Sequence, residues 1–171
     1  MTGNIMRRWE LNGGHGIRAE FASEFVNAET PDVKKTADIQ IAVVDDDDTN
    51  LRVAGTVLSK AGFRVSAMRS GRSLLKYLTD RSPDLILLDV QMPDMDGFET
   101  MRMLRRLKNG ASVPVVFLSA ADDENTERTG MQLGAEDFIE KPFLPELLIQ
   151  RVRRITELSA FRSSSAGRTN G

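Results

Sequence analysis

The chain alternates between short apolar runs and longer stretches in which apolar residues recur every three or four positions. A short apolar run rich in β-branched residues predicts a buried strand, whereas the longer period predicts an amphipathic helix. The apolar runs predict five strands, over residues 39–44, 63–68, 84–89, 113–119 and 137–141. The amphipathic stretches predict five helices, over residues 50–62, 71–81, 97–110, 122–135 and 145–158.

Regular alternation of strand and helix predicts an α/β fold in which helices cover both faces of a parallel sheet. Right-handed crossovers leave few topologies for five strands. We therefore expect a single doubly wound domain over residues 38–158, with the flavodoxin-like strand order 2-1-3-4-5. Residues 1–37 and 159–171 show no sustained period and are rich in small and polar residues, so we expect a flexible leader and a flexible tail there.

Composition narrows the class of protein. With 171 residues and 40% hydrophobic content, the chain can bury the core of one domain. A net charge of −2 gives no electrostatic reason to expect a nucleic-acid or membrane partner. The absence of cysteine excludes disulfides, thiol chemistry and a thiolate zinc site. We expect a soluble cytoplasmic protein.

The stretch "VVDDDDTN", residues 43–50, places four carboxylates directly after an apolar run. Two such charges about 5 Å apart repel by roughly 3 kcal/mol at an effective dielectric constant near 20. The N-terminus of a following helix returns only about 0.3–1 kcal/mol per carboxylate. Either some of these acids face solvent or cap the helix, as we expect of Asp47 and Asp48, or a cation lies among them.

The ends of the other predicted strands favour a cation. The carboxyl ends of neighbouring parallel strands meet at one edge of the sheet, where ligands bind. In the expected order, the polar residues at these ends fall on consecutive strands; they are Asp45, Asp46, Asp89, Ser119 and Lys141. Carboxylate oxygens suit a hard cation that keeps some of its water. We therefore predict a Mg²⁺ site, with Mn²⁺ as an alternative ion, at Asp45, Asp46 and Asp89.

Four stretches carry a resemblance to a known family; they are "IAVVDDDDTN", "PDLILLDVQMPDMDGFE", "VPVVFLSA" and "GAEDFIEKPF". In this order and at these spacings they resemble the receiver domain of bacterial two-component response regulators, over about residues 38–158. The resemblance implies a phosphoryl-accepting aspartate at Asp89. Few residues follow position 158, so we also expect a stand-alone regulator, similar to chemotaxis regulators, unless the chain is a piece of a longer protein. Such a protein is not an enzyme, apart from catalysing its own phosphorylation and dephosphorylation.

The resemblance also assigns roles to the remaining site residues. Mg²⁺ would be held by Asp46, Asp89 and the backbone carbonyl of Gln91, and by Asp45 largely through water. Ser119 and Lys141 would contact the phosphoryl oxygens, and the Lys141–Pro142 bond would be cis. Phe138 would be the switching aromatic, turning inward when Ser119 moves toward the phosphoryl group.

The partners that the resemblance implies are proteins. The phosphoryl donor would be a sensor histidine kinase or a histidine phosphotransfer protein. A downstream effector, or a second copy of the chain, would read the surface formed by residues 123–158.

Two other interpretations stay open at this point. "DDDDT" also fits D-x-D-x-T, the first motif of haloacid-dehalogenase-like phosphatases, in which Asp45 would be the nucleophile and Asp47 the general acid. That interpretation leaves Asp89 and "MPDMDG" (92–97) unexplained, and only Glu146 is available as a late metal ligand. The second interpretation is a receiver-like module that binds partners without being phosphorylated.

Overall fold

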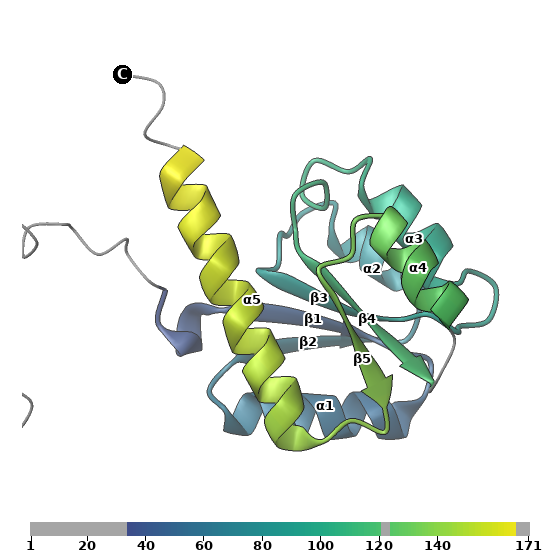
Figure 1. Cartoon of the computed structure of the whole chain (residues 1–171), viewed down its shortest axis with the longest axis horizontal. Coiled ribbons are helices and arrows are strands. Elements are labelled where there is room, and N and C mark those ends of the chain that lie inside the picture. The colour runs from purple at the N-terminus through teal and green to yellow at the C-terminus, as the bar shows by residue number, and fades with distance from the viewer. Residues whose placement is uncertain (1–33, 121–123, 167–171) are drawn as a thin grey trace, which may run out of the picture. The chain divides into compact units, whose positions relative to one another are not determined.

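The computed structural model describes residues 34–120 and 124–166 (Figure 1). Most of the predicted leader, residues 1–33, and residues 167–171 of the predicted tail lie outside the described residues. The strands are β1 (Gln40–Val44), β2 (Arg64–Met68), β3 (Leu85–Asp89), β4 (Val115–Ala120) and β5 (Asp137–Lys141). The helices are α1 (Asp48–Lys60), α2 (Gly71–Tyr77), α3 (Gly97–Leu104), α4 (Glu124–Gln132) and α5 (Pro145–Ala166), preceded by a short 3₁₀ helix, η2 (Thr36–Asp38).

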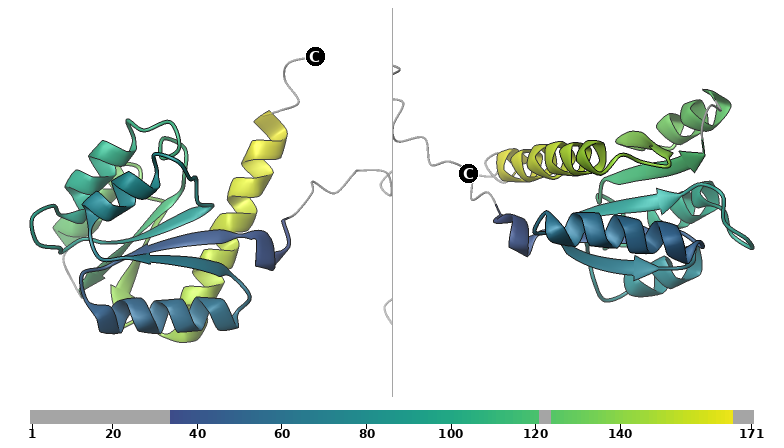
Figure 2. Two further views of the ribbon diagram at one scale, coloured as in Figure 1. Left: turned by 180° about the vertical axis from the view of Figure 1, so that it is seen from behind. Right: turned by 90° about the horizontal axis from the view of Figure 1, so that it is seen from below.

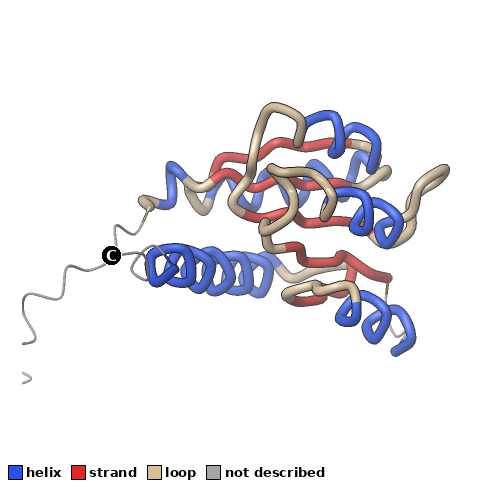
Figure 3. The backbone as a smooth tube through the Cα atoms, turned by 90° about the horizontal axis from the view of Figure 1, so that it is seen from above, coloured by secondary structure: helices blue, strands red, loops and turns tan. Residues whose placement is uncertain are grey.

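The five strands form one parallel sheet in the order β2-β1-β3-β4-β5, which confirms the predicted topology (Figure 1). Figure 3 shows the strands, in red, running side by side. The central strand β3 is buried along its whole length, as its uninterrupted apolar sequence requires. The edge strand β2 is partly exposed and alternates between apolar and polar residues. Since the sheet is parallel, the carboxyl ends of all the strands lie along one edge.

Two separate apolar clusters hold the helices against the sheet. Leu51 and Leu58 of α1 share a cluster with Val152 of α5, so these two helices cover one face. Leu74 of α2 and Met101 of α3 belong to the cluster on the other face. Figures 1 and 2 show these helices on opposite sides of the strands, with α4 on the side of α2 and α3.

Several helix boundaries differ from the prediction for local reasons. Helix α1 begins two residues early because the Asp47 carboxylate accepts hydrogen bonds from the N–H groups of Thr49 and Asn50, as a helix N-cap. Helix α3 ends at Leu104, six residues before the predicted end. The segment after it is held by the Arg105 guanidinium, which donates to the carbonyl oxygens of Gly110 at 3.0 Å and Val113 at 2.6 Å.

The last helix is longer than predicted. It was expected to end at residue 158, but α5 continues to Ala166, and its last turns run beyond the sheet (Figures 1 and 2). Arg162 anchors this extension through an ion pair with Glu136 at 2.7 Å. The hydroxyls of Ser163 and Ser164 donate to carbonyl oxygens of the preceding turn. The serine-rich composition had indicated a tail, although serine can satisfy its hydroxyl within a helix.

No helix in the described ranges is both long enough and apolar enough to cross a membrane.

Candidate functional site

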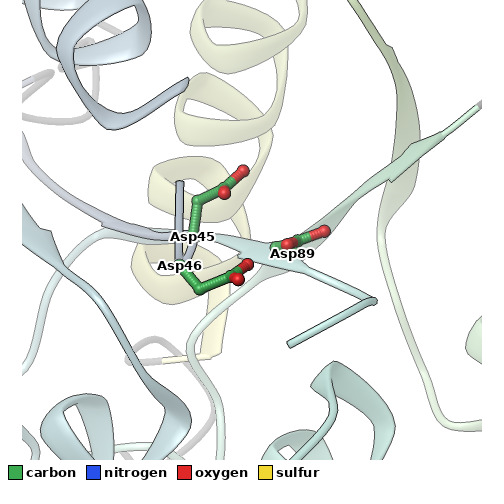
Figure 4. Close-up of side chains that lie close together, drawn as sticks. All are labelled: Asp45, Asp46 and Asp89. Carbon is green, nitrogen blue, oxygen red and sulfur yellow. The ribbon is translucent and has the colours of Figure 1, made fainter. Parts of the chain in front are cut away.

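Three carboxylates meet where β1 and β3 end. Asp45 and Asp46 directly follow β1, and Asp89 is the last residue of β3, the neighbouring strand. Each offers a carboxylate oxygen, and these oxygens lie within 4.8 Å of one another (Figure 4). Asp45 and Asp89 are buried, with 0% and 2% of their surface exposed, whereas Asp46 is exposed. The convergence predicted from the strand order is therefore confirmed for the acids.

Lys141, at the end of β5, supplies the positive charge of this cluster. Its Nζ donates to Oδ1 of Asp89 at 3.0 Å and to Oδ2 of Asp45 at 3.1 Å. The side chain thus reaches across β4, which lies between β3 and β5. The Lys141–Pro142 peptide bond is cis, as expected. Three carboxylates beside one ammonium leave a surplus of negative charge, so the donor set fits a hard divalent cation.

Burial and the ion pair shift the pKa of Asp89 in opposite directions, and they also oppose each other at Lys141. Burial raises the pKa of Asp89 to about 6; the hydrogen bond from Lys141 lowers it, and the charge of Asp45 raises it further. For Lys141, burial alone would lower the pKa, but the hydrogen bonds to Asp89 and Asp45 outweigh burial and raise the pKa above its usual range. Near neutral pH, therefore, Lys141 carries its charge and Asp89 is largely ionised.

Asp45 is held by further donors, one of which the sequence analysis missed. The Nδ2 of Asn50 lies 3.1 Å from Oδ2 and 3.3 Å from Oδ1 of Asp45. The backbone N–H of Asp47 donates to Oδ1 of Asp45 at 2.9 Å. Asn50 lies in the first turn of α1, five residues after Asp45, and that short spacing was the available signal. These contacts fix the orientation of the buried carboxylate.

The loop after β3 folds back onto Asp89. The N–H of Gln91 donates to Oδ1 of Asp89 at 3.2 Å, and Gln91 is otherwise exposed. The N–H of Gly97 donates to the carbonyl of Val90 at 2.9 Å. A Cβ at position 97 would lie 2.3 Å from the Asp89 carbonyl oxygen, so only glycine permits this approach. The segment "MPDMDG" thus shapes the backbone beside the acidic cluster, as its turn residues predict.

Ser119 directly follows Leu118, the β4 residue that pairs with Asp89, but its hydroxyl is turned to the backbone. Its hydroxyl donates to the carbonyl of Ala120 at 3.0 Å, and no bond to a site carboxylate is present among the described residues. Phe138 lies one strand away and is half-buried, with its ring centroid 5.4 Å from that of Phe117. The ring is therefore already packed against the core in this structure, and the expected inward movement is not tested by it.

The remaining two acids of the run behave as predicted. Asp47 caps α1, and its hydrogen bonds from the N–H groups of Asn50 and Thr49 lower the pKa of its carboxyl. Asp48 is exposed and pairs with Arg69 at 2.7 Å. The phosphatase alternative required Asp47 as a general acid, but the helix cap occupies this carboxylate.

Known proteins share this fold and this arrangement of motifs. The family model described as "Response regulator receiver domain" matches residues 41–153. The chain belongs to this family. The receiver domain is 35% identical over 127 residues to the transcriptional regulatory protein GltR of Pseudomonas aeruginosa, covering 74% of this chain and 52% of that protein. The chain thus spans about half the length of this curated relative.

Solved structures agree with the family assignment. A putative response regulator from Chloroflexus aurantiacus superimposes on this receiver domain with a TM-score of 0.66 at 32% identity, covering 69% of this chain and 97% of the other. The chemotaxis protein CheY4 of Vibrio cholerae also superimposes with a TM-score of 0.66, at 28% identity, covering 68% of this chain and 98% of CheY4. The chain thus contains a receiver domain, and its acidic cluster is typical of phosphoryl-accepting receivers.

Proposed function

We propose that Asp89 accepts a phosphoryl group from a phosphohistidine of a sensor histidine kinase or a histidine phosphotransfer protein. The observation that carries this proposal is the position of Asp89, buried at the end of the central strand between a second carboxylate and the ammonium of Lys141. A carboxylate can attack phosphorus only if its repulsion from the phosphoryl oxygens is offset. Lys141 already contacts Asp89 and supplies part of that offset.

A divalent cation supplies the rest. We propose Mg²⁺, with Mn²⁺ as an alternative, held by Asp46, Asp89 and the carbonyl of Gln91, and by Asp45 largely through water. When bound, such an ion neutralises phosphoryl oxygens and offsets the repulsion among the carboxylates. The exposed Asp46 leaves the site open to an ion and to its water. Ionised carboxylates are required, so the ion and protons compete for the site.

The transfer is a displacement at phosphorus. A carboxylate oxygen of Asp89 forms the new P–O bond while the P–N bond of the phosphohistidine breaks, and the imidazole leaves with the electron pair of that bond. Lys141 holds its proton throughout and donates to a phosphoryl oxygen. Ser119 releases the carbonyl of Ala120 and donates its hydroxyl to another phosphoryl oxygen. Phe138 then responds to the change at Ser119.

The output of the domain passes to another molecule. We propose that a downstream effector, or a second copy of the chain, reads the surface of α4, β5 and α5, over residues 123–158. We place this exchange in the cytoplasm, in keeping with the absence of cysteine. The expectation of no nucleic-acid partner rested on net charge alone, and the relative GltR is named a transcriptional regulator, so that expectation is not carried forward.

Acetyl phosphate is a phosphoryl donor that tests the acceptor without knowledge of the kinase. Incubated with acetyl phosphate and Mg²⁺, the full chain should gain the mass of one phosphoryl group, and peptide mapping should place it on Asp89. Asp89→Asn should abolish labelling, whereas Asp48→Asn, which removes an exposed aspartate of the same acidic run, should retain it. Labelling that survives Asp89→Asn and is lost in Asp45→Asn would instead support the phosphatase.

A further inference from the structure

A glycine in α4 lies in direct contact with the switching aromatic. Gly130 is buried in the last turn of α4 (Glu124–Gln132). A Cβ built at this position would lie 2.2 Å from Cζ and 2.9 Å from Cε2 of Phe138, and 2.9 Å from Cδ2 of Phe117. Such distances are shorter than real Cβ contacts, so the backbone of α4 itself packs on these two rings.

Local preference does not explain this glycine. Glycine within a helix costs about 1 kcal/mol relative to alanine. The carbonyl of Gly130 accepts from the N–H groups of Leu133 and Ala135, three and five residues further on, as in a closed helix C-terminus, and these backbone bonds do not require glycine at position 130. Gly55, in the middle of α1, offers a contrast, since a Cβ there would meet nothing within 4 Å. The requirement for glycine at position 130 is therefore a requirement of tertiary packing.

The contact joins α4 to a row of aromatic rings. Phe117 and Phe138 are paired residues of β4 and β5, and their ring centroids lie 5.4 Å apart. Phe98 of α3 continues the row, with its ring 5.2 Å from that of Phe117 in an edge-on arrangement. Ser119 lies two residues after Phe117, so it projects from the same face of β4. The row connects the strand that carries Ser119 with the underside of α4.

We infer that Gly130 is the positioning residue that lets Phe138 occupy its packed place, so that the ring and α4 move as one unit. With no side chain at position 130, the ring fills the space directly beneath the helix backbone. If the ring leaves, a void opens under α4, and close-packed interiors close such voids by moving the neighbouring element. This inference rests on the proposed function, in which Phe138 responds to phosphorylation, and it identifies α4 as the element that reports the ring's position.

A double-mutant cycle tests the packing without any phosphorylation. Gly130→Ala should raise the equilibrium constant for unfolding about tenfold, although alanine is the better helix former. In a Phe138→Ala background the same substitution should cost clearly less, because the ring that it would approach most closely is gone and only the 2.9 Å approach to Phe117 remains. Gly55→Ala is the matched control and should lower the unfolding constant about fourfold, from helix propensity alone. Equal effects of Gly130→Ala in both backgrounds would overturn the inference.

A second experiment follows the ring itself. The full chain is labelled with fluorophenylalanine, and the ¹⁹F resonance of Phe138 is assigned by its loss in Phe138→Leu. In Gly130→Ala the chemical shift of this resonance should become that of a solvent-exposed ring. Beryllofluoride, a phosphoryl mimic, should no longer change it. A Phe138 resonance in Gly130→Ala identical to that of the wild type, with and without the mimic, would contradict the inference.

The two proposals fail separately. If acetyl phosphate does not label Asp89 of the wild-type chain, the proposed function fails, while the double-mutant cycle still reports whether Gly130 positions the ring. If Asp89 is labelled in both the wild type and Gly130→Ala but the cycle is additive, only the role of Gly130 is lost.

Discussion

Nζ of Lys141 lies 3.0 Å from Oδ1 of Asp89, although 52 residues separate them in the chain. The contact spans the width of β4, because β5 and β3 flank that strand in the sheet. It is mostly shielded from water: the side chains of Lys141 and Asp89 are 17% and 2% exposed. Removing either Lys141 or Asp89 leaves the other charge buried without a partner of opposite sign, which is strongly destabilising, so we choose these residues for mutation.

The metal-free protein should depend on pH through Asp89. Its folded pKa, about 6, lies above the ordinary value of 3.8, so the folded state binds this proton more tightly than the unfolded chain. The resulting stability is fully present below about pH 3.8 and is lost as the pH rises through 6. Asp89→Asn has no carboxyl group to lose this stability. Its free energy of unfolding should therefore rise relative to that of the wild type as the pH increases, by roughly 3 kcal/mol at pH 7.5.

Urea unfolding in a chelating buffer, at intervals between pH 4 and 7.5, measures this difference. An advantage of Asp89→Asn that stays constant across the range would show that protonation of Asp89 does not govern the stability of the metal-free site.

Replacing Asp46 should separate metal binding from folding. Asp46→Ala removes one of three neighbouring carboxylates, so the metal-free protein should become more stable, by about 1 kcal/mol because the residue is exposed. Mg²⁺ should stabilise the wild type by about 2.7 kcal/mol at a hundredfold excess over Kd and should have no effect on Asp46→Ala. Thermal melts with and without Mg²⁺ measure both effects. Asp48→Ala is the control and should respond to Mg²⁺ as the wild type does. If Mg²⁺ raised the melting temperature of Asp46→Ala as much as that of Asp48→Ala, the proposed site would be ruled out.

Lys141→Met should make the protein dependent on the metal. Without Mg²⁺, the buried Asp45 and Asp89 lose their ammonium, and the free energy of unfolding should fall by about 3–5 kcal/mol. Mg²⁺ should then restore more stability than it adds to the wild type, because within the described ranges no other cationic side chain forms an ion pair with Asp45 or Asp89. Lys108→Met, at an exposed position, is the control. A Lys141→Met protein as stable as the wild type in chelator would exclude this role for the ion pair.

Asn50 should act through Asp45. Asn50→Asp keeps the shape of the side chain but replaces two N–H donors with a fourth carboxylate, so unfolding in chelator should become easier by about 1–3 kcal/mol. Mg²⁺ should recover part of this loss. Asn50→Ala, which removes the donors without adding charge, should cost less and recover less. Calorimetric titration with Mg²⁺ gives the affinity of each variant, and identical affinities in all three proteins would separate Asn50 from the metal site.

The order of the elements and the acidic cluster followed from the sequence alone. Apolar, β-branched runs define strands because they fit a sheet covered on both faces, and the alternation with amphipathic helices requires parallel strands. Once the strands are parallel, the polar residues that end β1, β3 and β5 must share one edge. Asp45, Asp89 and Lys141 therefore converge for reasons of topology.

Contacts between side chains were decided only by the tertiary structure. The sequence does not show that the Ser119 hydroxyl bonds to Ala120 instead of the site, because the direction of a hydroxyl depends on its surroundings. The extension of α5 brings Arg162 to Glu136, 26 residues away in the chain, a contact that the local sequence does not show. Glycine is a poor helix former, so local preference does not explain Gly130; the ring of Phe138, brought beneath it by the pairing of β4 with β5, does. The local pattern of apolar and polar residues determines which helices and strands form. Contacts between segments far apart in the sequence are set only when those elements pack together.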